Sequence, residues 1–145
     1  MILETACILL TAAALVPAGA HLLELPNKIG MSRDDYLAAQ GSYRGWQWVG
    51  VPLVAAIVAN AALALTAEVR SAAVGAGIGG ALLLVTLLVF ALVVLPVNRA
   101  TRNWTQAAAD WERLRRRWEY GHAANALLAL VALGAVVVGI VAGPG

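Results

Sequence analysis

The chain has 145 residues, of which 61% are hydrophobic and only 12% are charged, and its formal net charge is +2. Ordinary soluble domains carry about 25% charged residues, so this composition excludes a water-soluble globular protein and indicates an integral membrane protein. No nucleic-acid partner is expected, and the single cysteine, Cys7, has no second thiol with which to form an internal disulfide.

Four apolar runs are long enough to cross a bilayer, since a transmembrane helix needs about 20 mostly apolar residues. They cover roughly residues 2–25, 46–67, 71–96 and 120–142. Backbone groups cannot stay unpaired in lipid, and runs without a two-residue alternation exclude a β-barrel. The sequence therefore predicts an all-α fold, a transmembrane four-helix bundle that forms a single domain over residues 1–145.

The first run and the loop after it carry proline and capping signals. Pro17 is predicted to kink the first helix, and Pro26 is predicted to end it. In the polar loop from 27 to 45, Ser32 is followed by an arginine and two acidic residues, a pattern typical of a helix start. A short interfacial helix is therefore expected in this loop.

The second and third runs carry packing signals. Asn60 lies near the middle of the second run, and a hydrogen bond to a neighbouring helix is its expected role. The third run contains a glycine-rich stretch, 75–80, whose small-xxx-small spacing lets helix backbones approach closely.

The third loop, from 99 to 118, is the most polar part of the chain. Three tryptophans recur in it every seven residues and arginines cluster beside the last two: Trp104, Trp111, Trp118, Arg113, Arg115, Arg116 and Arg117. This spacing predicts an amphipathic helix at the membrane surface. Asp110 is placed to cap the second half of that helix, which would continue into the fourth span.

The basic residues predict the orientation in the membrane. Nine of the ten Lys and Arg residues lie in the first and third loops, and only Arg70 lies on the other side. By the positive-inside rule, both long loops face the cytoplasm and both termini face outward. The predicted location is the inner (plasma) membrane as a multi-pass protein with the lipid bilayer as its partner, and a homo-oligomer is left open.

Both histidines have a glutamate three residues away, and the order is reversed between the two pairs: His21 precedes Glu24, whereas Glu119 precedes His122. The first helix runs toward the cytoplasm and the fourth runs away from it, so the reversal matches the depths of like residues. Residues at i and i+3 also share a helix face. The sequence thus predicts a layer of two histidines beside a layer of two glutamates, about 4.5 Å nearer the cytoplasm.

Ionisable residues within a membrane segment are costly and usually have a partner or a function, so this cluster is the candidate site. Imidazole and carboxylate suit one divalent metal ion, iron or zinc with copper as an alternative, and helical bundles build such sites from Glu and His at i, i+3. The predicted metal ligands are His21, Glu24, Glu119 and His122. Bis-histidine haem ranks lower because it leaves both glutamates unexplained.

Two interpretations without a metal stay open beside this one. In the first, Glu–His hydrogen bonds clamp the first helix to the last. In the second, a histidine beside a carboxylate serves as a base toward a substrate. Asn98 and Asn125 are placed to join the same polar cluster.

One segment of the chain also resembles a known family. The residues that carry the resemblance keep a fixed spacing from the end of the third run into the fourth: Pro96-Val97-Asn98, Asn103-Trp104, Trp111, Leu114, Arg115, Trp118, Glu119 and His122. In this segment the chain resembles the anthrone oxygenase-like family of small four-helix membrane proteins, and His21 to Lys28 with Tyr43 to Trp46 is similar to a bacterial branch without an assigned role. The named members oxidise an anthrone to the anthraquinone with dioxygen.

The resemblance implies an oxidoreductase of the oxygenase type that acts on a hydrophobic, anthrone-like aromatic substrate entering from the bilayer. The catalytic candidates that it implies are Asn98, Arg115 and His122. His21 and Glu24 are not part of the polyketide enzymes' pattern, and they indicate an additional ligand set in this chain. The alternative hypothesis is a non-enzymatic membrane protein, structural or partner-binding, in which the His and Glu residues form a polar clamp.

Overall fold

The structure is a computed structural model that describes residues 1–143, and every regular element in that range is helical. The α-helices are α1 (Ile2–Lys28), α2 (Arg33–Gln40), α3 (Gly50–Thr66), α4 (Arg70–Val89), α5 (Leu95–Ala100) and α6 (Trp111–Val141). Three short turns complete the set: η1 (Gly41–Tyr43) and η2 (Trp46–Val49) are 3-10 turns, and η3 (Phe90–Val94) is a π-helical turn.

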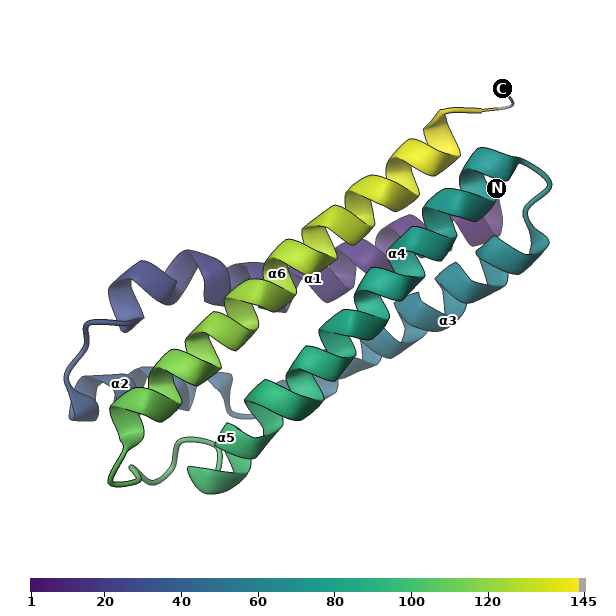
Figure 1. Cartoon of the computed structure of the whole chain (residues 1–145). Helices are drawn as coiled ribbons and strands as arrows, with labels where there is room; N and C mark the ends of the chain where they lie inside the picture. Colours follow the sequence, from purple (N-terminus) through teal and green to yellow (C-terminus); the bar gives the residue numbers. More distant parts are fainter. Residues whose placement is uncertain (144–145) are drawn as a thin grey trace.

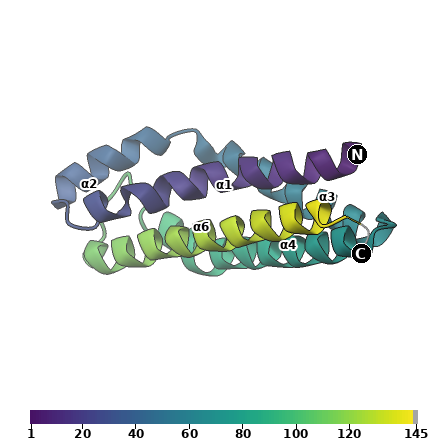
Figure 2. The ribbon, with the colours of Figure 1, turned by 90° about the horizontal axis from the view of Figure 1, so that it is seen from above.

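The long helices pack side by side along most of their length (Figure 1). The α6 helix packs on α4 and on α1, and α3 packs on the same two helices. Figure 2 shows the N-terminus, the C-terminal end of α6 and the α3–α4 turn together at one end, which we call the terminal end. The other end, with α2, α5 and the start of α6, is called the loop end.

Three helical stretches are long and apolar enough to cross a membrane: Ile2–Lys28, Arg70–Ala100 and Trp111–Val141. Their outward faces carry exposed large apolar side chains, as lipid contact requires, among them Leu9, Leu92 and Val138. The chain thus has the helices of a membrane protein. The α3 helix is also apolar but has only 17 residues, so a fourth span remains a prediction.

The first helix is longer than expected, because neither proline ends it. It runs through Pro17 and Pro26 to Lys28, so the predicted end at residue 25 is wrong. A proline removes only one backbone donor, and the helical bonding resumes where the amide of Ile29 donates to Leu25 at 3.0 Å. The consequence is that Lys28 lies in the last turn of α1 rather than in a loop.

The third run crosses a π-helical turn before it reaches Pro96, and it ends at residue 100 rather than 96. Pro96 has no N–H with which to bond the carbonyl of Leu92 four residues earlier. Arg117 of α6 donates to that carbonyl instead, at 2.8 Å. A side chain of the neighbouring helix therefore satisfies the acceptor that proline leaves free.

The α6 helix comes very close to this π-helical turn. A Cβ atom on Gly121 would lie 3.0 Å from a methyl of Val94 and 3.1 Å from a methyl of Val93. The glycine between Glu119 and His122 is therefore explained by packing, because a larger residue would push α6 away from η3.

The third loop does not form the predicted amphipathic helix, and that prediction is wrong for residues 101–110, which form turns. Arg102, Asn103 and Trp104 have φ angles of 48°, 54° and 60°, and left-handed backbone cannot continue a right-handed helix. The hydroxyl of Thr101 stabilises the turn by accepting from the amide of Trp104 at 3.1 Å. The second half of the loop does form a helix that continues unbroken into the fourth apolar run, as predicted, because α6 extends from residue 111 to residue 141. Asp110 stands at its N-cap position but makes no side-chain cap bond.

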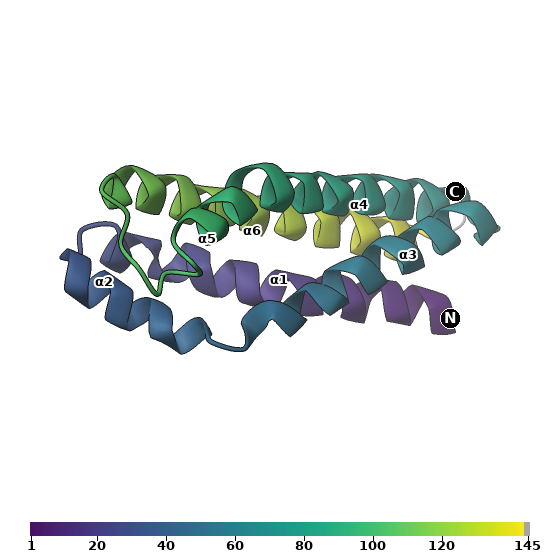
Figure 3. The same cartoon turned by 90° about the horizontal axis from the view of Figure 1, so that it is seen from below.

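The other loop does contain a helix. Ser32 caps α2 by accepting from the amide of Asp35 at 3.3 Å, as its position predicted. Figure 3 shows α2 folded back beside the loop end of α1, with the segment between α5 and α6 passing toward it. Its predicted location at the membrane surface remains a prediction.

Candidate functional site

The two histidines meet at the loop end of the helix bundle. His21 of α1 and His122 of α6 have ring centroids 4.2 Å apart, and the ring planes are inclined by 35°. His21 is buried. The reversed order of His and Glu therefore places the histidines at one level, as the sequence predicted.

Aromatic rings surround the histidine pair. Tyr43, Trp118 and Trp46 lie 4.5, 4.9 and 6.0 Å from the ring of His21. The indole of Trp118 also meets the ring of His122 edge-on at 4.2 Å. These rings come from η1, η2 and α6, so the segment between α2 and α3 forms one side of the site.

The two glutamates are not paired with the histidines. The ammonium of Lys28 lies 3.3 Å from an oxygen of Glu119 and 3.4 Å from an oxygen of Glu24. Glu119 is fully buried and Lys28 nearly so. The expected Glu–His hydrogen bonds are replaced by a Glu–Lys–Glu bridge between α1 and α6, because the extended α1 brings Lys28 back over Glu24 at i+4.

Two tyrosines complete this bridge. Tyr36 of α2 donates to Glu119 at 2.9 Å, while Tyr43 accepts from Lys28 at 2.8 Å and donates to Glu24. Burial, followed by the neighbouring Glu119 carboxylate, raises the pKa of Tyr36 well above its usual value. Burial and the bond to Glu24 likewise raise the pKa of Tyr43. Both phenols therefore remain protonated donors at neutral pH.

The ammonium of Lys28 also lies over aromatic rings, 4.5 Å from the centre of Tyr43 and 5.2 Å from that of Trp118. Attraction to ring faces adds to the two ion pairs. We call the group formed by His21, Glu24, Lys28, Glu119 and His122 the His–Lys cluster.

Asn98 and Arg115 lie one layer away from the histidines. Asn98 accepts from the indole N–H of Trp118 at 2.7 Å and so fixes the ring that touches both histidines. Arg115 donates to the backbone carbonyl of Met31 at 2.6 Å and stacks 4.6 Å from the ring of Trp111. Both residues therefore position neighbouring parts of the site, such as Trp118 and the backbone at Met31, rather than the imidazoles.

Several buried polar atoms in this region have no hydrogen-bond partner within the part of the chain that the structure describes: His21 Nδ1, Glu119 Oε2, Arg115 Nε and Asn125 Oδ1. An unpaired buried polar atom is costly, so each one in a native structure needs an explanation. His21 Nδ1 is the one that lies within the aromatic surround. This nitrogen is therefore available for a hydrogen bond or a proton transfer.

The arrangement does not fit the predicted metal centre. Residues 1–143 contain no group of three or more His, Cys, Asp or Glu side chains placed to hold a metal ion. Lys28 takes the position between the carboxylates that a cation would need, and its positive charge opposes a second one. Of the four predicted ligands, the two imidazoles lie against each other, and the two carboxylates are paired with Lys28.

Sequence reasoning missed Lys28, Tyr36 and Tyr43 as members of the site. The Glu24–Lys28 spacing of four residues is a usable signal for the first of them, but Pro26 between them indicates the end of a helix. No spacing pattern predicts the two tyrosines, because loop backbone of about 20 residues brings them onto the cluster.

Two surface hollows lie elsewhere at the loop end, and Trp111 lines both of them. One, of about 290 Å³, is lined by Ser32, Arg33, Asp34 and Trp111. The other, of about 340 Å³, is lined by residues 109–113 and Arg116. Neither hollow is lined by a histidine of the cluster.

Comparisons of the chain with protein-family models, with curated proteins and with solved structures found no match.

Proposed function

We propose that the chain is a four-span protein of the inner (plasma) membrane, with the loop end in the cytoplasm and both termini outside. The support for a fourth span is length. The 17 residues of α3 extend about 25 Å at 1.5 Å per residue, and the preceding turn η2 adds several more, against a hydrocarbon core of about 30 Å. The support for the orientation is the excess of basic residues at the loop end.

The function proposed for the His–Lys cluster is oxidation of a hydrophobic, weakly acidic aromatic compound by dioxygen. In this scheme an imidazole takes a proton from an activated carbon of the substrate, and the resulting carbanion reduces dioxygen. Overall, a methylene becomes a carbonyl, and one dioxygen supplies the carbonyl oxygen and one water. The choice of oxygen chemistry rests on the resemblance of the segment from Asn98 to His122 to the anthrone oxygenase-like family.

The observation that carries this proposal is the state of the histidine pair. His21 presents a buried nitrogen that has no partner in residues 1–143, inside a surround of aromatic rings. The carboxylates that would compete for the imidazoles are held by Lys28 instead. A neutral imidazole in an apolar surround has the properties of a general base.

The other predicted catalytic residues receive supporting roles. Asn98 fixes Trp118 against both histidines, and Arg115 ties α6 to the start of α2. Substrate would approach through the side formed by η1 and η2, where Trp46 is part of the histidine surround and is 39% exposed. That side is also where Gly45 adopts a φ of 90°, a conformation that favours glycine.

Oxygen consumption and quinone absorbance test the proposal, with purified protein in lipid nanodiscs and anthrone as substrate. His122→Ala is expected to lower the rate about 100-fold or more, as loss of a general base does. Asn60→Ala is the matched control, because Asn60 is a buried polar residue of the terminal end. If His122→Ala and His21→Ala both retain the rate of the unmodified protein, the imidazoles are not the base.

A second candidate function is structural, and the Glu–Lys–Glu bridge favours it. Lys28 links α1 to α6, and Tyr36 ties α2 to the same carboxylate, so the cluster holds three elements together. In that case the unmodified protein would not oxidise the substrate, and the histidine substitutions would change only the free energy of unfolding. The oxygen measurement above separates the two candidates.

A further inference from the structure

The outward face of α6 changes character along its length. At the loop end it carries Arg113, Arg116 and Arg117, which we call the arginine face. One turn further along the same face is Tyr120, which is exposed. Beyond it the face is apolar, with Leu127, Leu130, Val131 and Val138 exposed.

This order gives the arginine face a depth in the membrane. Leu127 lies 11 residues after Arg116, about 16 Å along the helix axis, and Tyr120 lies between them. Tyrosine is enriched where acyl chains meet headgroups, and long basic side chains reach outward from that boundary. In a bilayer the guanidinium groups are therefore expected at the level of the lipid phosphates.

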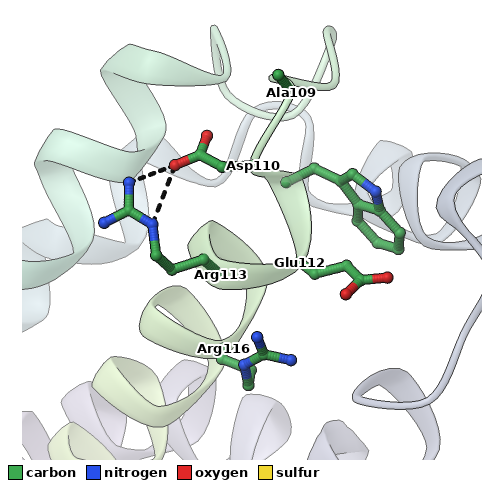
Figure 4. A pocket seen from close by; sticks show the side chains of 6 residues that line it. Ala109, Asp110, Glu112, Arg113 and Arg116 are labelled. Carbon is green, nitrogen blue, oxygen red and sulfur yellow. Dashed lines mark hydrogen bonds and ion pairs between the residues drawn. The ribbon is translucent and has the colours of Figure 1, made fainter.

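The three arginines differ in how far their charge is already satisfied. Arg113 pairs with Asp110, and this bond, the main cause, lowers the pKa of Asp110 and keeps it ionised (Figure 4). Arg117 donates a hydrogen bond from one guanidinium nitrogen to the carbonyl of Leu92. Arg116 takes part in none of the ion pairs found among residues 1–143.

A hollow of about 340 Å³ adjoins this face and is lined by Arg113 and Arg116 together with Asp110, Glu112, Ala109 and Trp111. In Figure 4 the side chain of Arg116 lies below Arg113, away from the ion pair between Arg113 and Asp110. The carboxylate of Glu112 lies to the right. The hollow is thus lined by the guanidinium of Arg116, which is in no ion pair among residues 1–143, and by the indole of Trp111.

The charge of the surroundings favours an anion. Nine of the ten basic residues lie at the loop end, together with six of the eight acidic ones: Glu24, Asp34, Asp35, Asp110, Glu112 and Glu119. Glu24 and Glu119 are held by Lys28, and Asp110 by Arg113. Glu112 is the one nearby carboxylate in the hollow without an ion pair among the described residues, so the basic groups exceed the free acidic ones.

We propose that the arginine face, with the hollow beside Trp111, is a binding site for the headgroup phosphate of an anionic phospholipid. Arg116 and the free nitrogens of Arg117 would hold the phosphate oxygens, since a guanidinium fork matches phosphate geometry. The acyl chains would follow the apolar face below Tyr120. This site is separate from the His–Lys cluster and does not depend on the function proposed for it.

Native mass spectrometry of the detergent-solubilised chain tests the site, with titration of phosphatidylglycerol, phosphatidylcholine, phosphatidylethanolamine and, separately, inorganic phosphate. The double variant R116Q/R117Q is compared with R44Q/R70Q, which removes the same charge outside the arginine face. R116K/R117K keeps the charge but loses the fork. Far-UV circular dichroism confirms that each variant is helical.

The unmodified chain and R44Q/R70Q are expected to retain phosphatidylglycerol in preference to the two zwitterionic lipids. R116Q/R117Q should bind it about 25-fold more weakly, because each arginine near an anionic surface contributes about fivefold. R116K/R117K should fall between these values. Equal retention of all three lipids, or an unchanged affinity in R116Q/R117Q, would overturn the site. Inorganic phosphate bound as tightly as the lipid would overturn the assignment to a lipid headgroup.

Discussion

The two ends of the helix bundle are held together in different ways. At the loop end, α1, α2 and α6 meet through long polar and aromatic side chains whose partners are far apart in the sequence, such as Tyr36 and Glu119. At the terminal end, α4 and α6 approach until Gly75 and Gly139 are in backbone contact. The polar contacts there include Asn60 donating to Thr11 at 3.1 Å and Ser71 donating to the carbonyl of Gly143 at 3.0 Å.

The difference between the two ends is one of packing, because the terminal end is the closely packed one. An apolar layer of Ala56, Leu83, Ala129 and Ala132 separates Asn60 from the histidines. Small side chains and close backbones give dense packing with little side-chain entropy to lose. Unpaired buried polar atoms are concentrated at the loop end, where they include His21 Nδ1 and Glu119 Oε2, whereas Asn60 Oδ1 is the example at the terminal end among the described residues. This is why the candidate site is assigned to the loop end.

The largest effect is expected at Lys28. Replacing it by methionine leaves Glu119 buried without its cation, which costs about 3–5 kcal/mol of the free energy of unfolding. SDS titration in mixed micelles, followed by circular dichroism, measures this cost. The double change Lys28→Met with Glu119→Gln removes both charges and should recover most of the loss. A cost below about 1 kcal/mol for the single change would contradict a buried ion bridge.

An intermediate effect is expected for Tyr36→Phe. It removes a hydrogen bond to the buried carboxylate of Glu119 and should cost about 1.5–3 kcal/mol. Tyr120→Phe is the matched control, because Tyr120 is exposed and makes no side-chain hydrogen bond among residues 1–143, so its cost should be close to zero. Equal costs for the two variants in the same SDS titration would contradict a stabilising bond from Tyr36 to the buried carboxylate.

The raised pKa of Tyr36 also predicts a pH dependence. The folded chain holds the phenolic proton more tightly than the unfolded chain, whose tyrosines ionise near pH 10. The stabilisation is therefore complete below pH 10 and is lost as the pH rises above it. Tyr36→Phe should flatten the fall in stability between about pH 10 and 12, measured by the same unfolding titration.

The smallest effect is expected at the terminal end. In Gly139→Ala the new Cβ atom would lie 2.6 Å from the carbonyl of Ser71, so the helices must separate, at about 1–3 kcal/mol. Gly134→Ala on the same helix has nothing within 4 Å and should be neutral or slightly stabilising, since alanine favours helix. Destabilisation by both changes alike would show that the close approach of α4 and α6 is not what holds this end.

Much of the fold could be predicted from particular residues. The level of His21 and His122, the cap at Ser32 and the hydrogen bond of Asn60 to another helix all followed from helical spacing and from the rule that buried polar groups find partners. The predicted end of α1 is wrong because Pro26 favours a helix end, whereas the ion pair between Glu24 and Lys28 at i+4 requires the helix to continue past it. The helix predicted over residues 101–110 was wrong because a seven-residue tryptophan repeat does not reveal left-handed backbone at Trp104.

The sequence by itself determined that this is an all-helical membrane protein with its basic and aromatic residues at one end, because composition and apolar run length act locally along the chain. It also placed the two histidines at one depth, because helix rise is constant. Only the tertiary structure decided the partners of the two glutamates. Those partners, Lys28 and the tyrosines, depend on where α1 ends and on how α2 and η1 fold back, and long-range packing sets both.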